Sequence, residues 1–217
     1  VDALWFDEAE PEIHPEHFDN LIWYAGRADM VGLLYPYYYS KMAYDGFKSI
    51  GRDDIITLTR CAYLGSQKFG SLVWSGDIES TFESLACQVK AGLNMSMCGI
   101  PWWNTDIGGF YGADITSDYF KELIVRWFQF GLFSPVMRLH GSRNRHFEPT
   151  PGLKEPSGDP NEIWSFGEKN FEILKNLIFI REKLRPYIQT QMDIASEKGY
   201  PVMRPMFFEY PDDENCY

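Results

Sequence analysis

The chain has 217 residues, 45% of them hydrophobic and 17% aromatic, which is enough apolar material for the buried core of one domain or of a piece of a larger one. The net charge of −11 disfavours a nucleic-acid partner, because phosphate binding needs a basic surface. No apolar run reaches 18 residues and no signal peptide is evident, so we expect no membrane partner.

Short apolar runs alternate with longer segments of helical spacing. In chain order, we expect a strand at 2–6, helices at 15–25 and 35–50, strands at 55–60 and 71–75, a helix at 79–94, a strand at 97–103, a helix at 116–131, a strand at 135–139 and a long helix at 167–197. This alternation indicates the parallel βα units of an α/β fold. In such folds the functional site forms at the carboxyl ends of the strands.

Two segments interrupt the alternation. Residues 141–166 are rich in glycine, proline and small polar residues, which predicts a long loop that covers the site, with a helix start at 159–162. Residues 200–208 form another strand-like run. The chain also opens inside an apolar run, at 3–6, and we therefore expect it to be a part of a longer protein.

The cysteines and histidines give no sign of a cofactor. The four cysteines contain no C-x-x-C pair and are too sparse for a disulfide framework, so we interpret them as reduced thiols of a cytoplasmic protein. We find no zinc-ligand spacing, no dinucleotide or phosphate-binding fingerprint and no G-x-S-x-G elbow, and we expect no cofactor and no metal.

Three aspartates follow strand candidates in aromatic surroundings. Asp7 and Asp77 each end an apolar run that contains tryptophan, and Asp106 follows the pair Trp102 and Trp103. Two facing carboxylates can break a glycosidic bond, and aromatic faces suit the apolar faces of a sugar. The alternative is structural: Asp7 and Asp77 could cap the next helix, and at least one tryptophan of the pair is expected in the core.

Basic side chains end two further strand candidates. Arg60 and Arg138 would each need a carboxylate or ligand partner if buried. His140 lies two residues after Arg138, so both side chains can point the same way, although a lone histidine is usually structural. Glu10 and Glu12 are interpreted as solvated residues or hydrogen-bonding supports rather than as catalysts.

Together these segments resemble the catalytic domain of glycoside hydrolase family 31, the α-glucosidase and α-xylosidase family. Residues 5–12 read W-F-D-E-A-E-P-E and are similar to the family's W-x-D-x-x-E-P nucleophile motif, while residues 74–77, W-S-G-D, are similar to its acid/base motif. The resemblance implies that Asp7 is the nucleophile and Asp77 the acid/base. It further implies substrate-binding roles for Trp5, Arg60, Trp74, Trp103, Asp106, Phe110, Arg138 and His140.

The family's catalytic domain is a (β/α)8 barrel of the TIM type, with its nucleophile after the fourth strand. The resemblance therefore implies that residues 1–199 are the second half of this barrel, strands 4 to 8 with outer helices, and that residues 200–217 lead into a following β-sandwich module. We expect the strands not to close into a barrel.

The implied reaction is retaining hydrolysis of terminal non-reducing α-linked xylosyl or glucosyl residues through a covalent glycosyl-enzyme. The partner is then an oligosaccharide or α-glycoside, and a homo-oligomer is left open. Residues 8–12, E-A-E-P-E, are more similar to α-xylosidase-type members and favour a xyloside. The alternatives are an α-transglucosylase or α-glucan lyase on the same site, or an inactive sugar-binding homologue; the presence of both Asp7 and Asp77 argues against the last.

Overall fold

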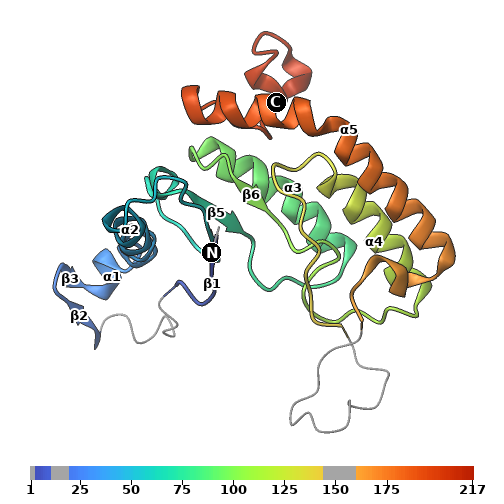
Figure 1. The fold of residues 1–217 in the computed structure, drawn as a ribbon, viewed down its shortest axis with the longest axis horizontal. Coiled ribbons are helices and arrows are strands. Elements are labelled where there is room, and N and C mark those ends of the chain that lie inside the picture. Colours follow the sequence, from blue (N-terminus) through green and yellow to red (C-terminus); the bar gives the residue numbers. More distant parts are fainter. Residues whose placement is uncertain (1–2, 11–19, 144–159) are drawn as a thin grey trace, which may run out of the picture.

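A computed structural model describes residues 3–10, 20–143 and 160–217 (Figure 1). Its centre is a four-stranded sheet in the order β1-β4-β5-β6, formed by β1 (Leu4–Phe6), β4 (Thr57–Thr59), β5 (Ser71–Trp74) and β6 (Trp103–Asn104). All three pairings are parallel, and the register places Thr59 opposite both Phe6 and Val73. The carboxyl ends of the strands therefore lie along one edge of the sheet.

Helices connect these strands. Between β1 and β4 lie the antiparallel pair β2 (Ile22–Trp23) and β3 (Gly26–Arg27), the short helix α1 (Ala28–Val31) and α2 (Leu34–Ser49). Helix α3 (Phe82–Met97) connects β5 to β6, and α4 (Asp118–Gly131) and α5 (Glu168–Lys198) follow. Figure 1 shows α2 at one end of the molecule, the sheet in the middle, and α3, α4 and α5 at the other end. The 3-10 helices are η2 (Ser66–Phe69), η3 (Ile163–Phe166), η4 (Met206–Phe208) and η5 (Glu214–Cys216).

The main core forms around α4. Its buried residues recur at helical spacing, and Ser117 caps the helix by accepting a hydrogen bond from the Phe120 amide. Leu123, Ile124 and Trp127 on this face are fully buried, and they belong to one cluster with Leu174 of α5. Each such side chain contributes about 1.5–3 kcal/mol by burial, so this shared core holds α4 against α5.

The predicted parallel βα units are confirmed, and so are the helices at 35–50, 79–94, 116–131 and 167–197, each to within three residues at its ends. The strand predicted at 97–103 is wrong over most of its length, because α3 continues to Met97 and only Trp103 and Asn104 pair with β5. Gly99, with φ +76°, turns the chain between the two elements.

Residues 135–139 do not form the predicted strand. Within the described part of the chain, this segment contributes one isolated parallel bridge, between Leu139 and Ile107. Pro135 has no N–H with which to start a ladder. The bridge nevertheless brings residues 138–140 beside the end of β6.

Two further predictions fail locally, and two others lie partly outside the described residues. Of the helix expected at 15–25, residues 20–25 contain β2 and a turn, and residues 15–19 lie outside the described residues. The strand-like run at 200–208 contains η4 instead, since Pro201 and Pro205 remove backbone donors. The expected helix start at 159–162 leads into the 3-10 helix η3, and most of the loop predicted at 141–166 lies outside the described residues.

The remaining broad expectations concern the membrane and the thiols. None of the helices in the described ranges is both long and apolar enough to cross a membrane. All four cysteines are free thiols, as predicted.

Candidate active site

Three strand ends bring Asp7, Arg60 and Asp77 together. Asp7 directly follows β1, Arg60 directly follows β4, and Asp77 lies just beyond β5. Nη1 of Arg60 lies 3.3 Å from Oδ1 of Asp7 and 3.5 Å from Oδ2 of Asp77. Because one nitrogen contacts both carboxylates, these two oxygens are at most about 7 Å apart, a limit compatible with the roughly 5–5.5 Å between the carboxyl groups of a retaining glycosidase.

The backbone fixes the direction of the Asp7 carboxylate. The Arg60 amide donates to the Phe6 carbonyl at 3.3 Å, so the parallel ladder extends to the edge of the site. Glu8 has a positive φ of 49°, and its amide donates to Oδ1 of Asp7 at 3.0 Å. The side chains of Asp7 and Asp77 are 51% and 29% exposed, so a ligand can reach both.

Glu10 holds the guanidinium of Arg60 from the other side. Its Oε1 accepts a hydrogen bond from Nε of Arg60 and also pairs with Nη2. Burial is the largest single effect and acts to raise the pKa of Glu10, but the hydrogen bond from Arg60, the Arg60 charge and further hydrogen bonds together outweigh it. The pKa is therefore lowered, and Glu10 is an anion at neutral pH. The hydrogen bond to Glu10 in turn raises the pKa of Arg60. Glu10 thus occupies the supporting position that the sequence predicts for it.

A second ion pair lies deeper, at the end of β6. Asp106 is fully buried and pairs through Oδ1 with Nη2 of Arg138, whose Nε donates to Oδ1 of Asn104 at 3.1 Å. Burial raises the pKa of Asp106 to about 6, although the Arg138 charge acts against the shift. Burial likewise lowers the pKa of Arg138. Among the described residues the buried Oδ2 of Asp106 has no hydrogen-bond partner, so its capacity as an acceptor is unused.

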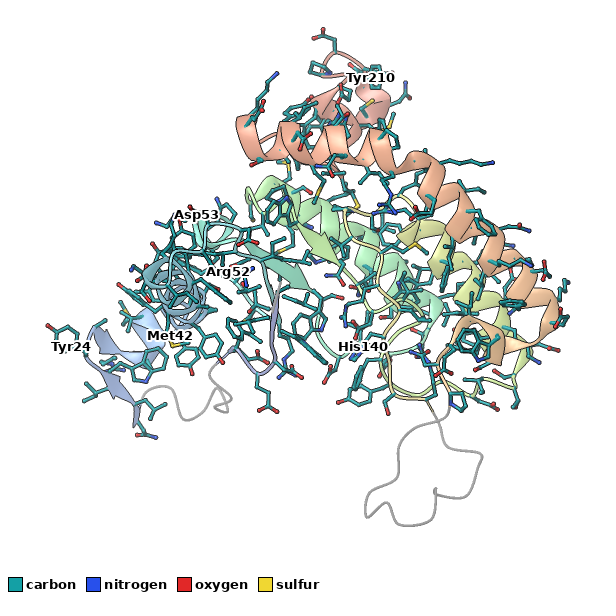
Figure 2. The ribbon with its side chains drawn as sticks, viewed as in Figure 1. Tyr24, Met42, Arg52, Asp53, His140 and Tyr210 are labelled. Carbon is teal, nitrogen blue, oxygen red and sulfur yellow. The ribbon has the colours of Figure 1, made fainter. Side chains whose placement is uncertain are left out.

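Five rings form a continuous line beside the carboxylates, which we call the aromatic arc: Trp74, Trp5, His140, Phe110 and Tyr111. Successive ring centroids lie 6.0, 5.3, 5.5 and 4.6 Å apart. Figure 2 shows His140 between β1 and the part of the molecule that carries α4. Burial lowers the pKa of His140 and the nearby Arg138 charge adds to the effect, so its imidazole is neutral at neutral pH. The arc offers apolar surface next to charged oxygen atoms, a combination that suits a sugar.

The structure brings together nine of the ten residues singled out from the sequence, and Trp103 is the exception. The Trp103 side chain is 2% exposed and packs in a core cluster with Val73 and Ile100. A Cβ added to Gly92 of α3 would lie 2.8 Å from its ring, so the ring presses directly on that helix. This placement corrects the expectation for Trp103, because its strand position turns the ring toward the helices and away from the carboxylates.

Sequence reasoning missed Arg143, which is almost fully buried. Its Nη1 donates to the Gly109 carbonyl at 2.7 Å and its Nε to Oδ1 of Asn161 at 2.8 Å. Burial lowers its pKa to about 10, so it stays charged at neutral pH. Arg143 therefore joins the loop after β6 to the segment before η3. Its sequence position, within a segment predicted to be a loop, gives no sign of this role.

The site offers no evident place for a resident metal. The described residues contain no group of three or more histidine, cysteine, aspartate or glutamate side chains that could hold a metal ion. Its charged groups are instead paired as carboxylates with arginines, which leaves oxygen acceptors and aromatic faces for a ligand.

The family model for the glycosyl hydrolases family 31 TIM-barrel domain matches residues 1–191. The chain belongs to this family. A solved GH31 α-xylosidase from a soil metagenome, in complex with xylose, is 47% identical with a TM-score of 0.93, over 100% of this chain and 33% of that one. The α-xylosidase of Saccharolobus solfataricus is 34% identical over 100% of this chain and 28% of its own length. The cycloalternan-degrading enzyme of Trueperella pyogenes, solved with a covalent intermediate, is 29% identical with a TM-score of 0.80, over 100% of this chain and 28% of that one.

Family membership confirms the fold class predicted from the sequence: a TIM-barrel domain of which this chain forms a part, with a parallel sheet and outer helices. The chain spans about a third or less of the length of these relatives. The division at residues 199 and 200, the cytoplasmic location and a homo-oligomer stay predictions.

Proposed function

We propose that this chain carries the reacting carboxylates of a retaining α-glycosidase that hydrolyses terminal non-reducing α-linked xylosyl or glucosyl residues. The observation that carries the proposal is the contact of Asp7 and Asp77 with the same nitrogen of Arg60, which brings oxygen atoms of two exposed carboxylates to within about 7 Å of each other. A retaining mechanism needs such a close pair. The covalent intermediate solved in the cycloalternan-degrading relative supports the same choice.

In this proposal Asp7 is the nucleophile. Its carboxylate attacks the anomeric carbon and forms an ester while the glycosidic bond breaks. Nη1 of Arg60 lies beside the attacking carboxylate, and Glu10 keeps the guanidinium in place.

Asp77 is the general acid and then the general base. It gives its proton to the leaving glycosidic oxygen in the first step and takes a proton from the attacking water in the second. The unpartnered Oδ2 of Asp106 and the inner rings of the aromatic arc would hold the sugar between the two carboxylates. Asp106 accepts from sugar hydroxyls, while Trp5 and Phe110 offer apolar faces.

We favour an α-xyloside as substrate. Residues 8–12 support this choice, and so do the relatives described as α-xylosidases, one of them solved with xylose. The test is turnover of p-nitrophenyl α-xyloside and α-glucoside by the complete protein, with NMR detection of the anomer released first.

A retaining hydrolase releases the α-anomer, and we expect faster turnover of the xyloside. Release of the β-anomer would contradict the mechanism. Binding without release of nitrophenol would favour the inactive sugar-binding alternative. A transglucosylase would give a longer saccharide, and a lyase an unsaturated sugar.

A further inference from the structure

Tyr111 contacts the carboxylate of Asp77, although the reaction described above assigns it no part. Its hydroxyl donates to Oδ2 of Asp77 at 3.2 Å. The negative charge of Asp77 raises the pKa of the Tyr111 phenol, so the hydroxyl stays protonated and remains a donor at neutral pH. Asp77 Oδ2 therefore contacts both the guanidinium of Arg60 and this phenol.

The backbone fixes Tyr111 relative to Asp77. The Tyr111 amide donates to the Ile78 carbonyl at 3.0 Å, and its carbonyl accepts from the Ser80 amide at 2.9 Å. These bonds frame an isolated parallel bridge between Glu79 and Tyr111. The segment after Asp77 and the segment after Asp106 are thus paired. In this pairing Tyr111 lies opposite Glu79, two residues after Asp77.

The Tyr111 ring forms one end of the aromatic arc. It packs edge-on against Phe110, at 4.6 Å and 90°, and the residue is 51% exposed. Trp74 at the other end of the arc is 2% exposed, although its neighbour Trp5 is 51% exposed. The Tyr111 ring therefore has an open surface beside the residue that would protonate the leaving oxygen.

We propose that Tyr111 positions Asp77 and forms the platform for the leaving group, a sugar ring or another aglycone with an apolar face. The inference rests on the proposed function of the site. The glycosidic oxygen must meet Asp77, so the group beyond that oxygen extends past Asp77 toward solvent, where the Tyr111 ring lies. The hydroxyl holds the carboxyl in the direction of that oxygen, and the ring packs against the leaving group.

Two variants of the complete protein separate the hydroxyl from the ring. Tyr111→Phe removes only the hydroxyl. We expect kcat/KM for an α-xylosyl disaccharide, whose leaving group needs a proton, to fall about tenfold with KM nearly unchanged, while α-xylosyl fluoride stays within about twofold. Tyr111→Ala also removes the ring. In addition to the loss seen in Tyr111→Phe, we expect Tyr111→Ala to raise KM for the disaccharide by about tenfold. The kinetics on α-xylosyl fluoride, which lacks a ring on the leaving side, should again change little.

Tyr119→Phe is the matched control. Tyr119 is 50% exposed, and its hydroxyl accepts a hydrogen bond from the Phe82 amide at 3.1 Å instead of meeting a carboxylate. We expect wild-type kinetics on both substrates. A merely structural effect of losing a tyrosine hydroxyl would appear equally in both Phe variants.

Wild-type kcat/KM for the disaccharide in Tyr111→Phe would overturn the positioning role. An unchanged disaccharide KM in Tyr111→Ala would overturn the platform. Equal losses on disaccharide and fluoride would also overturn the inference, since they would reflect general damage. A wild-type protein inactive on every α-glycoside would refute the proposed function itself and the inference with it.

Discussion

Gly109 lies where the loops of Asp77 and Asp106 pack against each other, and Gly109→Ala tests that contact. A Cβ at this position would lie 2.6 Å from Cα of Ser80 and 2.7 Å from the carbonyl oxygen of Glu79. These are backbone atoms, so no side chain can turn aside to relieve the contact. The φ of Gly109 is +77°, which an alanine adopts only with strain.

Gly112→Ala is its matched control. Gly112 has a φ of +80°, but a Cβ there would meet nothing within 4 Å. We expect Gly112→Ala to lower the free energy of unfolding by about 1 kcal/mol, from the left-handed backbone alone. Gly109→Ala adds the overlap with the facing backbone, about 1–3 kcal/mol for overpacking, for a total of about 2–4 kcal/mol.

The assay is urea unfolding of the complete protein together with kcat/KM for p-nitrophenyl α-xyloside. Because the overlap can be relieved only by moving the two loops apart, Gly109→Ala should also displace Asp77 and lower kcat/KM by about 100-fold, as a misplacement near 1 Å can do. Gly112→Ala should stay within a few-fold of wild type. Equal unfolding free energies for the two variants, or a fully active Gly109→Ala, would refute the loop contact.

Three further predictions concern the charged groups. Asp7→Ala should abolish turnover of every substrate. Asp77→Ala should slow the turnover of substrates with poor leaving groups far more than that of aryl glycosides, and it should yield a glycosyl azide when azide is added. Equal losses on both kinds of substrate, without the azide product, would contradict the acid/base role. Glu10→Gln should free the Arg60 guanidinium and lower kcat/KM about tenfold on all substrates, and unchanged kinetics would show that Arg60 needs no second carboxylate. The raised pKa of Asp106, about 6, means that the folded state holds this proton up to a higher pH than the unfolded state. The stability that the proton confers is therefore present below pH 4 and lost as pH rises through 6. Measured by urea unfolding and relative to Asp106→Asn, the free energy of unfolding of the wild type should fall by up to about 3 kcal/mol between pH 4 and 7. A difference between the two proteins that does not depend on pH would contradict the shift.

The charged centre of the site could be predicted because it follows from chain order alone. Asp7, Arg60 and Asp77 each come after an apolar run, and parallel strands bring their carboxyl ends to one edge. The sequence therefore places these side chains near one another before any coordinate is known. The structure adds that Asp7 and Asp77 contact the same nitrogen of Arg60, which limits the distance between the two carboxylates. It adds no further residue to this group of three.

The misses arise where local patterns are ambiguous or where contacts depend on loop pairing. The run at 97–103 is apolar in either conformation, and only packing decides that α3 continues to Met97. The side chain of Trp103 faces the helices. A strand of only two residues shows no alternating pattern in the sequence from which the direction of its side chains could be predicted. Tyr111 and Arg143 gain their roles from bonds between distant loops, which no spacing rule records.

The central claim is that Asp7 forms a covalent bond to the sugar, and trapping that bond tests it most directly. The complete protein would be incubated with 5-fluoro-α-xylosyl fluoride, which slows the hydrolysis of a glycosyl-enzyme, and then digested for peptide mass spectrometry. We predict one added fluoroxylosyl group, on Asp7, and none in Asp7→Ala. Turnover of α-xylosides without any label, or a label on Asp77 or another residue, would contradict the account.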